Sequence, residues 1–291
     1  MQTLWFLIKL FFQFAIAFAF LHTCVTHFLL WYEQQQLRLQ NQEVVRVSWK
    51  TWLQSFVTEF FCVSLKGILY PFQFWSFDAN TKAEAGVSVP ILLVHGYLNH
   101  KVDWLWFLKT LKKNPNIGPI YAINLFPPFA SITQLALTVK AKVNEIRETT
   151  KAPQVILIGH SMGGLVCSYF SEYLANPNEI AMVIALGSPF QGTKLTALGY
   201  GLNVKEMSPN SSFLSELNTR IHQSTIPYYS IASKIDNMII PWQSALLSDV
   251  DGNTLENTMV LEDHGHLRLL ISKPVLEQIT KWIVPQPKAI S

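Results

Sequence analysis

The stretch VILIGHSMGG, residues 155–164, constrains the fold of this chain more than any other. Its unbroken aliphatic run is typical of a strand that is buried on both faces of a parallel sheet. The apolar residues that follow repeat at helical spacing, namely Leu165, Val166, Tyr169, Phe170, Tyr173 and Leu174. A helix must therefore begin where the strand ends, and the chain turns sharply at Ser161. The glycines two places to either side leave room for the helix to fold back over the strand.

The same alternation of strand and helix recurs over the chain from about residue 88. Short aliphatic runs predict six strands, at Val89–Gly96, Ile120–Phe126, Gln154–Gly159, Ile180–Pro189, Ile226–Ser233 and Thr258–Glu262. Such strands, separated by amphipathic helices, predict an α/β fold with a mostly parallel, doubly wound sheet and flanking helices. Ligands bind these sheets at the carboxyl ends of the strands. Ser161 is expected at that edge.

Charge and cysteine content exclude several functional classes. The net charge of the 291 residues is only +3, and it is too scattered to form a nucleic-acid surface, so no nucleic-acid partner is expected. The three cysteines lack metal-ligand spacing and are expected to be small buried apolar residues. We therefore expect no metal and no cofactor.

The apolar excess of the chain is concentrated at its N-terminus. The run Leu10–Tyr32 has no formally charged residue and is long enough to cross the roughly 30 Å of bilayer hydrocarbon. Trp5, Trp31 and Tyr32 flank it as interfacial aromatic anchors would. The alternatives are a signal peptide, which usually has a shorter apolar run, and a buried core helix. Residues 1–32 are therefore predicted to form a single-pass membrane anchor. Basic residues lie on both sides of the run, which leaves open on which side of the membrane residues 88–291 lie.

Residues 33–87 are predicted to link this anchor to the remaining domain, residues 88–291. The link begins with a polar connector from Glu33 to Glu43. A juxtamembrane helix follows, with an apolar face formed by Trp49, Trp52, Leu53, Phe56, Val57 and Phe60. Ser55 and Glu59 lie away from that face. The apolar face is consistent either with core packing or with a helix at the membrane interface.

A serine hydroxyl becomes a nucleophile only beside a base that an acid orients. After a G-x-S-x-G turn, the expected chain order is serine, then an acid, then histidine. The segment KIDNMIIP offers Asp236 directly after a predicted strand. The poorer acids Asp249 and Asp251 lie in SDVDGN, which is typical of a solvated turn.

The segment DHGHL offers two candidate bases, His264 and His266, after the next predicted strand. His266 is preferred because it follows Gly265 and opens an apolar run whose packing would fix the imidazole. His264 stays an alternative.

Five motifs in this order resemble the α/β-hydrolase superfamily, and more narrowly its lipase and esterase branch. They are LLVHGY, GHSMGG, LGSPFQGT, DNMIIP and GHLRLL, and the resemblance covers Val89 to Ile283. The first 88 residues are only loosely similar to membrane-anchored bacterial members. The chain departs from related lipases at Phe190, where they often carry histidine; this affects the expected substrate preference and no triad position.

The resemblance implies a catalytic triad of nucleophile, acid and base, here Ser161, Asp236 and His266. It also implies a nucleophile elbow with Gly159 and Gly163. The backbone N–H groups of Tyr97 and Met162 would form an oxyanion hole.

These features predict a serine hydrolase that cleaves carboxylic esters through an acyl-enzyme, and the anchor favours lipid or other hydrophobic esters. The fold also hosts thioesterases, acyltransferases and non-catalytic binding proteins, which remain alternatives. The long segment Phe190–Gln223 is expected to cover the acyl site. The alternative is that it only packs a crossover helix against the sheet.

Overall fold

The computed structural model describes residues 1–72, 89–248, 254 and 256–284. The predicted domain boundary at residues 87 and 88 and the carboxylates of Asp249 and Asp251 lie outside this part of the chain.

All six predicted strands are present, and each pairing among them is parallel in the described ranges. They form one sheet in the order β2-β1-β3-β4-β5-β6. The strands are β1 (Ile91–Val94), β2 (Ile120–Ile123), β3 (Val155–His160), β4 (Ile180–Leu186), β5 (Tyr228–Ser233) and β6 (Thr258–Leu261).

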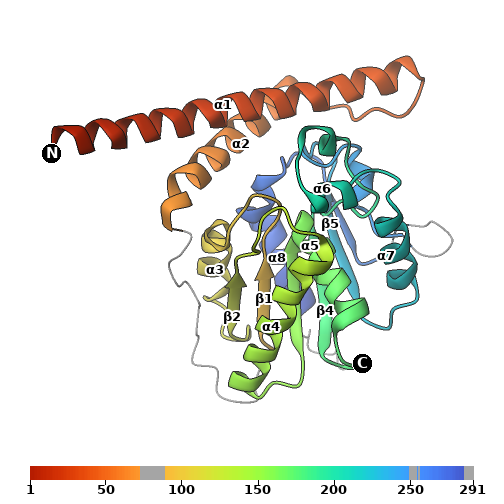
Figure 1. Cartoon of the computed structure of the whole chain (residues 1–291). Coiled ribbons are helices and arrows are strands. Elements are labelled where there is room, and N and C mark those ends of the chain that lie inside the picture. The colour runs from red at the N-terminus through yellow and green to blue at the C-terminus, as the bar shows by residue number, and fades with distance from the viewer. Residues whose placement is uncertain (73–88, 249–253, 255, 285–291) are drawn as a thin grey trace.

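Helices cover both faces of the sheet (Figure 1). One face packs on α4 (Ile132–Thr150), α5 (Met162–Tyr169) and α7 (Ser212–His222), and the other on α3 (Leu105–Leu111) and α8 (Lys273–Ile283). Successive strand residues point to opposite faces, so Leu92 joins the first core cluster and Leu93 the second. Burial on both faces explains why the strands are unbroken aliphatic runs.

The helices α1 (Gln2–Leu39) and α2 (Trp49–Leu69) precede the sheet and pack antiparallel to each other. They lie across the carboxyl ends of the strands, the edge that also holds α6 (Leu202–Glu206) (Figure 1). Because α1 continues to Leu39, most of the predicted polar connector from Glu33 to Glu43 is helical. Glu33 and Arg38 lie on the last turns of this helix, and Glu33 forms an ion pair with Lys194 of the α/β domain.

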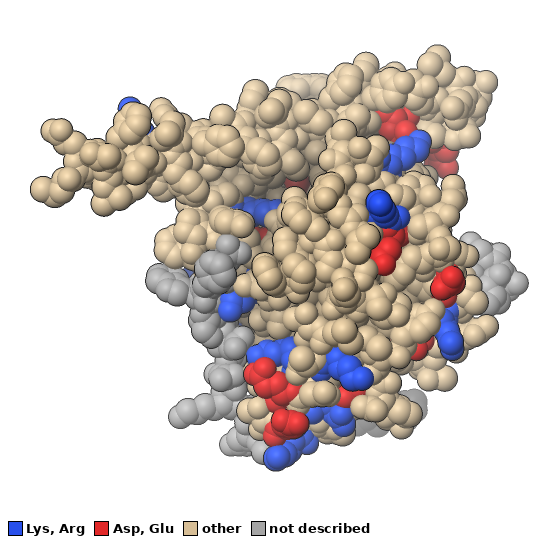
Figure 2. Space-filling view, viewed as in Figure 1, with Lys and Arg blue, Asp and Glu red and all other residues tan. Residues whose placement is uncertain are grey.

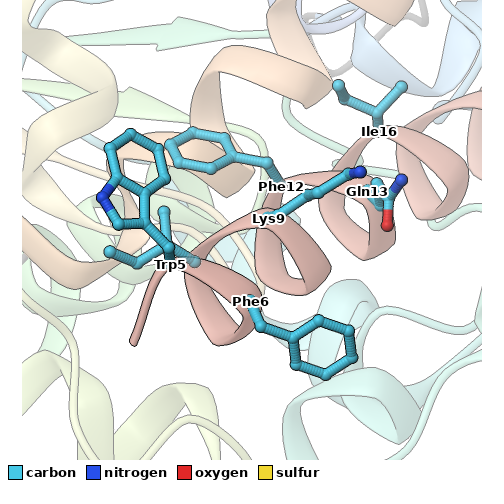
Figure 3. A pocket seen from close by; sticks show the side chains of 7 residues that line it. Trp5, Phe6, Lys9, Phe12, Gln13 and Ile16 are labelled. Atoms are coloured by element: carbon cyan, nitrogen blue, oxygen red, sulfur yellow. The ribbon is translucent and has the colours of Figure 1, made fainter. Parts of the chain in front are cut away.

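Among the described residues, α1 is long and apolar enough to cross a membrane. The side chains of its first half are exposed almost all round, and Figure 3 shows Trp5, Phe12 and Ile16 projecting from it beside Lys9. The second half packs on α2 and on the domain below, and its buried side chains are Ala19, Thr23, Thr26, His27, Leu30 and Glu33. The predicted span Leu10–Tyr32 therefore includes a part that contacts the α/β domain.

Helix α2 has its polar side turned inward. Its buried residues are Ser55, Glu59 and Val63, whereas Trp49 and Leu53 of the apolar face are exposed. The alternative that the apolar face packs as core is therefore wrong for these exposed residues. The physical reason is the surface beneath α2, where backbone N–H groups require hydrogen-bond acceptors.

Candidate active site

Ser161 lies between β3 and α5 with φ 56° and ψ −127°, a conformation that is rare for a residue with a side chain. Its N–H donates to the Leu186 carbonyl at the end of β4, at 2.8 Å. A Cβ atom on Gly159 would lie 2.4 Å from the Gly163 carbonyl carbon, and one on Gly163 would lie 2.3 Å from the Val94 oxygen. Side chains at either position would therefore force α5 away from the sheet.

Asp236 and His266 are in contact, although 30 residues separate them in the chain. The His266 Nδ1 lies 2.8 Å from the Asp236 Oδ2, and both side chains are buried. The other oxygen, Oδ1, accepts hydrogen bonds from the N–H groups of Met238 and Ile239, at 2.8 and 2.9 Å. Because Asp236 engages Nδ1, the Nε2 atom of His266 is left for a proton exchange with a hydroxyl.

Further contacts bring this pair to the strand that carries Ser161. The rings of His160 and His266 have centroids 4.5 Å apart, and the His160 Nε2 donates to the His266 carbonyl at 3.2 Å. Burial holds the pKa of His160 well below its usual range, so this neighbouring ring is neutral. The loops after β5 and β6 thus converge on the elbow after β3.

His264, the alternative base, has other partners. Its Nδ1 lies 2.7 Å from the Asp263 Oδ1, and its Nε2 lies 2.8 Å from the Ser272 hydroxyl. Both ring nitrogens are therefore engaged away from Asp236. The structure brings the predicted acid to His266 and not to His264.

The loop after β1 passes directly beside the serine. A Cβ atom on Gly96 would lie 2.8 Å from the Ser161 Cβ. Within the described ranges, the N–H groups of Tyr97 and Met162 have no hydrogen-bond partner in the protein. Two free donors next to Ser161 match the requirement of an oxyanion hole.

His95 has a structural role in the same loop. Its Nε2 accepts a hydrogen bond from the Leu125 N–H at 2.9 Å, and its Nδ1 donates to the Gly96 carbonyl at 2.8 Å. Burial lowers the pKa of His95 to about 3. A neutral ring with both nitrogens bonded holds the Gly96 backbone in place.

The segment Phe190–Gln223 divides into two parts. In α7, Leu214, Leu217 and Ile221 are buried against the sheet, as the crossover interpretation predicts. The earlier part exposes Leu198, Tyr200 and Leu202, and the Tyr97 hydroxyl donates to the Tyr200 carbonyl at 2.7 Å. Only this earlier part lies beside the predicted oxyanion loop.

The part of the chain that the structure describes has no cluster of three or more His, Cys, Asp or Glu side chains arranged to hold a metal ion.

Sequence reasoning missed three polar residues at this edge, namely Thr26, Glu59 and Asn237. Asn237 could have been noticed because it directly follows the predicted acid. The signal for Glu59 was weaker: it is a carboxylate four residues after Ser55 in a helix that is otherwise rich in aromatic residues.

Comparisons with known proteins agree with this fold. Residues 89–220 match the family model of the alpha/beta hydrolase fold. The mature lipase BlEst2 of Bacillus licheniformis superposes with a TM-score of 0.58 at 14% identity, covering 72% of this chain and 98% of that one. The naproxen esterase of Bacillus subtilis gives a TM-score of 0.51 at 13% identity, covering 75% and 98%.

A sequence relative is lysosomal thioesterase PPT2-B of Xenopus laevis. It is 26% identical over 205 residues, which cover 66% of this chain and 69% of the relative. The parallel sheet, the strained serine turn and these similarities lead to one conclusion: this chain has the α/β-hydrolase fold.

Proposed function

We propose that this protein is a membrane-attached serine hydrolase that cleaves carboxylic esters. The observation that carries the proposal is the Asp236–His266 contact of 2.8 Å beside the strained Ser161 turn. An acid, a base and a partly exposed hydroxyl on three separate loops are the parts that nucleophilic catalysis by serine requires.

The proposed reaction proceeds through an acyl-enzyme. The Ser161 Oγ attacks the ester carbonyl carbon while the His266 Nε2 takes the hydroxyl proton. Asp236 stabilises the resulting imidazolium, and the N–H groups of Tyr97 and Met162 bind the oxyanion. When the tetrahedral intermediate collapses, the bond to the alcohol oxygen breaks and His266 returns the proton to the leaving alcohol. Water then releases the acid by the same steps.

A hydrophobic ester or lipid is the proposed substrate class, and a membrane is the proposed location. In support, α1 exposes apolar side chains all round in its first half, where Lys9 is the one formally charged side chain. In Figure 2 the projecting left-hand part of this helix is almost entirely tan, whereas charged side chains are frequent on the lower part of the molecule. A substrate held in a bilayer would thus meet the edge of the sheet that carries Ser161.

The contacts of α1 favour a retained anchor over a cleaved signal peptide. Glu33 forms an ion pair of 2.7 Å with Lys194, and the Thr26 hydroxyl accepts a hydrogen bond from Asn237 at 2.8 Å. Cleavage after the apolar run would remove Thr26, and the Asn237 amide would lose this hydrogen bond.

Thioester hydrolysis is a second candidate, favoured by the similarity to the Xenopus laevis thioesterase. The same three residues would serve, since a thiolate would replace the alcohol as leaving group. Rates on matched oxoesters and thioesters of one acyl chain would decide between the two substrates.

The direct test is labelling of the detergent-solubilised full-length protein with a fluorophosphonate. We expect covalent modification at Ser161 and no labelling of the Ser161→Ala variant. If the folded wild-type protein stays unlabelled, the chain is a binding protein that keeps the fold without turnover.

Polar replacement of Leu198 and Leu202 together is expected to impair long-chain esters selectively. These side chains are 67% and 53% exposed next to the loop of Tyr97, where they would contact an acyl chain. Hydrolysis of p-nitrophenyl palmitate should fall about tenfold, the loss expected from removing 1–2 kcal/mol of apolar contact, with little change for the acetate. Equal losses on both esters would show that the segment has only a structural role.

A further inference from the structure

Helices α1 and α2 contact the oxyanion, acid and base loops of the proposed site, in addition to supplying an apolar surface. The polar contacts run from Thr26 to Asn237, from Glu33 to Lys194, from Lys66 to Asn99, and from Glu59 to the backbone of Leu267 and Arg268. The first of these reaches the acid loop and the last reaches the base loop, residues 262–270. A simple tether would need none of them.

Glu59 acts as a helix cap for a segment about 200 residues away. Its Oε2 accepts a hydrogen bond from the Leu267 N–H at 3.1 Å, and its Oε1 accepts one from the Arg268 N–H at 2.8 Å. These N–H groups open the 3-10 helix η6 (Leu267–Leu270), which starts directly after His266. The first N–H groups of a helix lack partners inside it and normally take them from a nearby side chain. Here α2 provides the acceptor.

The preceding N–H group, that of His266 itself, is held from α1. It donates to the Asn237 Oδ1 at 3.0 Å, and the Asn237 Nδ2 in turn donates to the Thr26 hydroxyl at 2.8 Å. The backbone N–H groups of three successive residues, 266–268, are therefore held by the N-terminal helices. Two of them bond directly to Glu59, and the third is linked to Thr26 through the Asn237 side chain. Together with the bond to Asp236, they fix both the backbone and the ring of His266.

The base loop is shaped around Glu59. A Cβ atom on Gly265 would lie 2.4 Å from the Glu59 Cγ, so only glycine allows the carboxylate to approach. Glu59 is 1% exposed, and burial raises its pKa to about 7. The hydrogen bonds from Arg268 and Leu267 act in the opposite direction and stabilise the carboxylate. A carboxylate buried at this cost is consistent with a specific role at the loop.

We propose that Glu59 and Thr26 are positioning residues of the active site, which hold the base loop so that His266 meets Ser161. The helix pair is then part of the catalytic unit, and attachment to the membrane and assembly of the site are coupled. This inference rests on the proposed function, because it takes His266 as the base. It requires that loss of either residue lowers kcat and leaves KM nearly unchanged, since neither is placed to bind substrate.

Each positioning residue has a matched control on its own helix. Ser55 is as buried as Glu59 and lies one turn away, but its hydroxyl contacts His27 at 3.4 Å and not the base loop. Thr23 lies near Thr26, and its hydroxyl bonds to the Ala19 carbonyl of its own helix at 2.8 Å. The comparisons are therefore Glu59→Ala with Ser55→Ala, and Thr26→Val with Thr23→Val.

In the full-length solubilised protein, kcat should be measured per fluorophosphonate-titrated site, so that unfolded molecules do not count. We expect Glu59→Ala to lower kcat on the order of 10²-fold, the loss that a misplacement of about 1 Å causes. Glu59→Gln keeps one acceptor and should lose less, and Thr26→Val should lose about tenfold. Both controls should stay within about twofold of wild type. If Glu59→Ala matches Ser55→Ala in kcat, the inference is overturned.

Amide hydrogen exchange gives a readout that does not depend on turnover. Exchange of a peptide covering residues 265–270 should accelerate in Glu59→Ala and not in Ser55→Ala, while a peptide from β3 is unchanged in both. Unchanged exchange in Glu59→Ala would also overturn the inference. If the wild-type protein neither labels nor turns over esters, the proposed function fails, and the exchange result still decides whether Glu59 holds the loop.

Discussion

Replacing Ser161 with alanine is expected to lower ester turnover by about 10⁴-fold or more, by analogy with serine-protease triads. The variant lacks the oxygen that would form the acyl-enzyme, so only the oxyanion donors and substrate binding remain to assist water. Alanine is smaller than serine and adds no atom beside Gly96. Initial rates on a soluble p-nitrophenyl ester, with circular dichroism to check the fold, measure the effect.

Ser171→Ala is a suitable control for this variant. The Ser171 hydroxyl is buried and donates to the Cys167 carbonyl of the previous helical turn, at 2.9 Å. It should leave turnover within a few-fold of wild type. A folded Ser161→Ala protein with a tenth of the wild-type activity would contradict the assignment of the nucleophile.

The second large effect concerns the base. His266→Ala should lower turnover by about 10⁴-fold or more, because the serine then has no group to take its proton. His264→Ala should cost far less, since the His264 ring contacts Asp263 and Ser272 and not Asp236. The measurement is kcat/KM of both variants on the same ester, with melting temperatures recorded for each.

These two variants test the choice between the histidines directly. Loss of turnover in His264→Ala, with activity retained in His266→Ala, would show that the Asp236–His266 contact is structural. If both variants lose turnover and only one shows a large drop in melting temperature, the loss in that variant is assigned to unfolding.

The sequence predicts the sheet well because the relevant signals are local. Each strand is a short aliphatic run, and residues such as Leu92 and Leu93 are buried on opposite faces as a covered parallel sheet requires. The signal for the serine turn is equally local. Glycine is required at positions 159 and 163 because a Cβ atom there would clash with backbone atoms of the same strand–helix unit or of the adjacent strand. Asp236 and His266 can be predicted from their order in the chain, because the fold brings the loops after successive strands to one edge of the sheet.

The N-terminal helices could not be placed in the same way. Their partners in the acid and base loops are more than 200 residues away, and hydrophobic periodicity alone suggested that the apolar face of α2 turns inward or toward lipid. In the structure, Glu59 turns inward because the backbone N–H groups of Leu267 and Arg268 beneath α2 need an oxygen acceptor. A tryptophan side chain has no such acceptor. Hydrophobic periodicity indicates which side chains of a helix avoid water. It does not indicate which hydrogen-bond acceptors a neighbouring loop requires.

The cover that α1 and α2 form over the strand ends has a consequence for how a soluble form of the protein can be prepared. Deleting the first 72 residues would leave the sheet and its two core clusters intact, since neither cluster contains a residue from α1 or α2. The N–H groups of Leu267 and Arg268 would then face solvent, and the Asn237 amide would lose Thr26. Such a fragment would be expected to fold and yet give a misleadingly low specific activity. Shorter deletions that stop before Ala19 remove only the exposed half of α1 and are the better starting point for crystallisation.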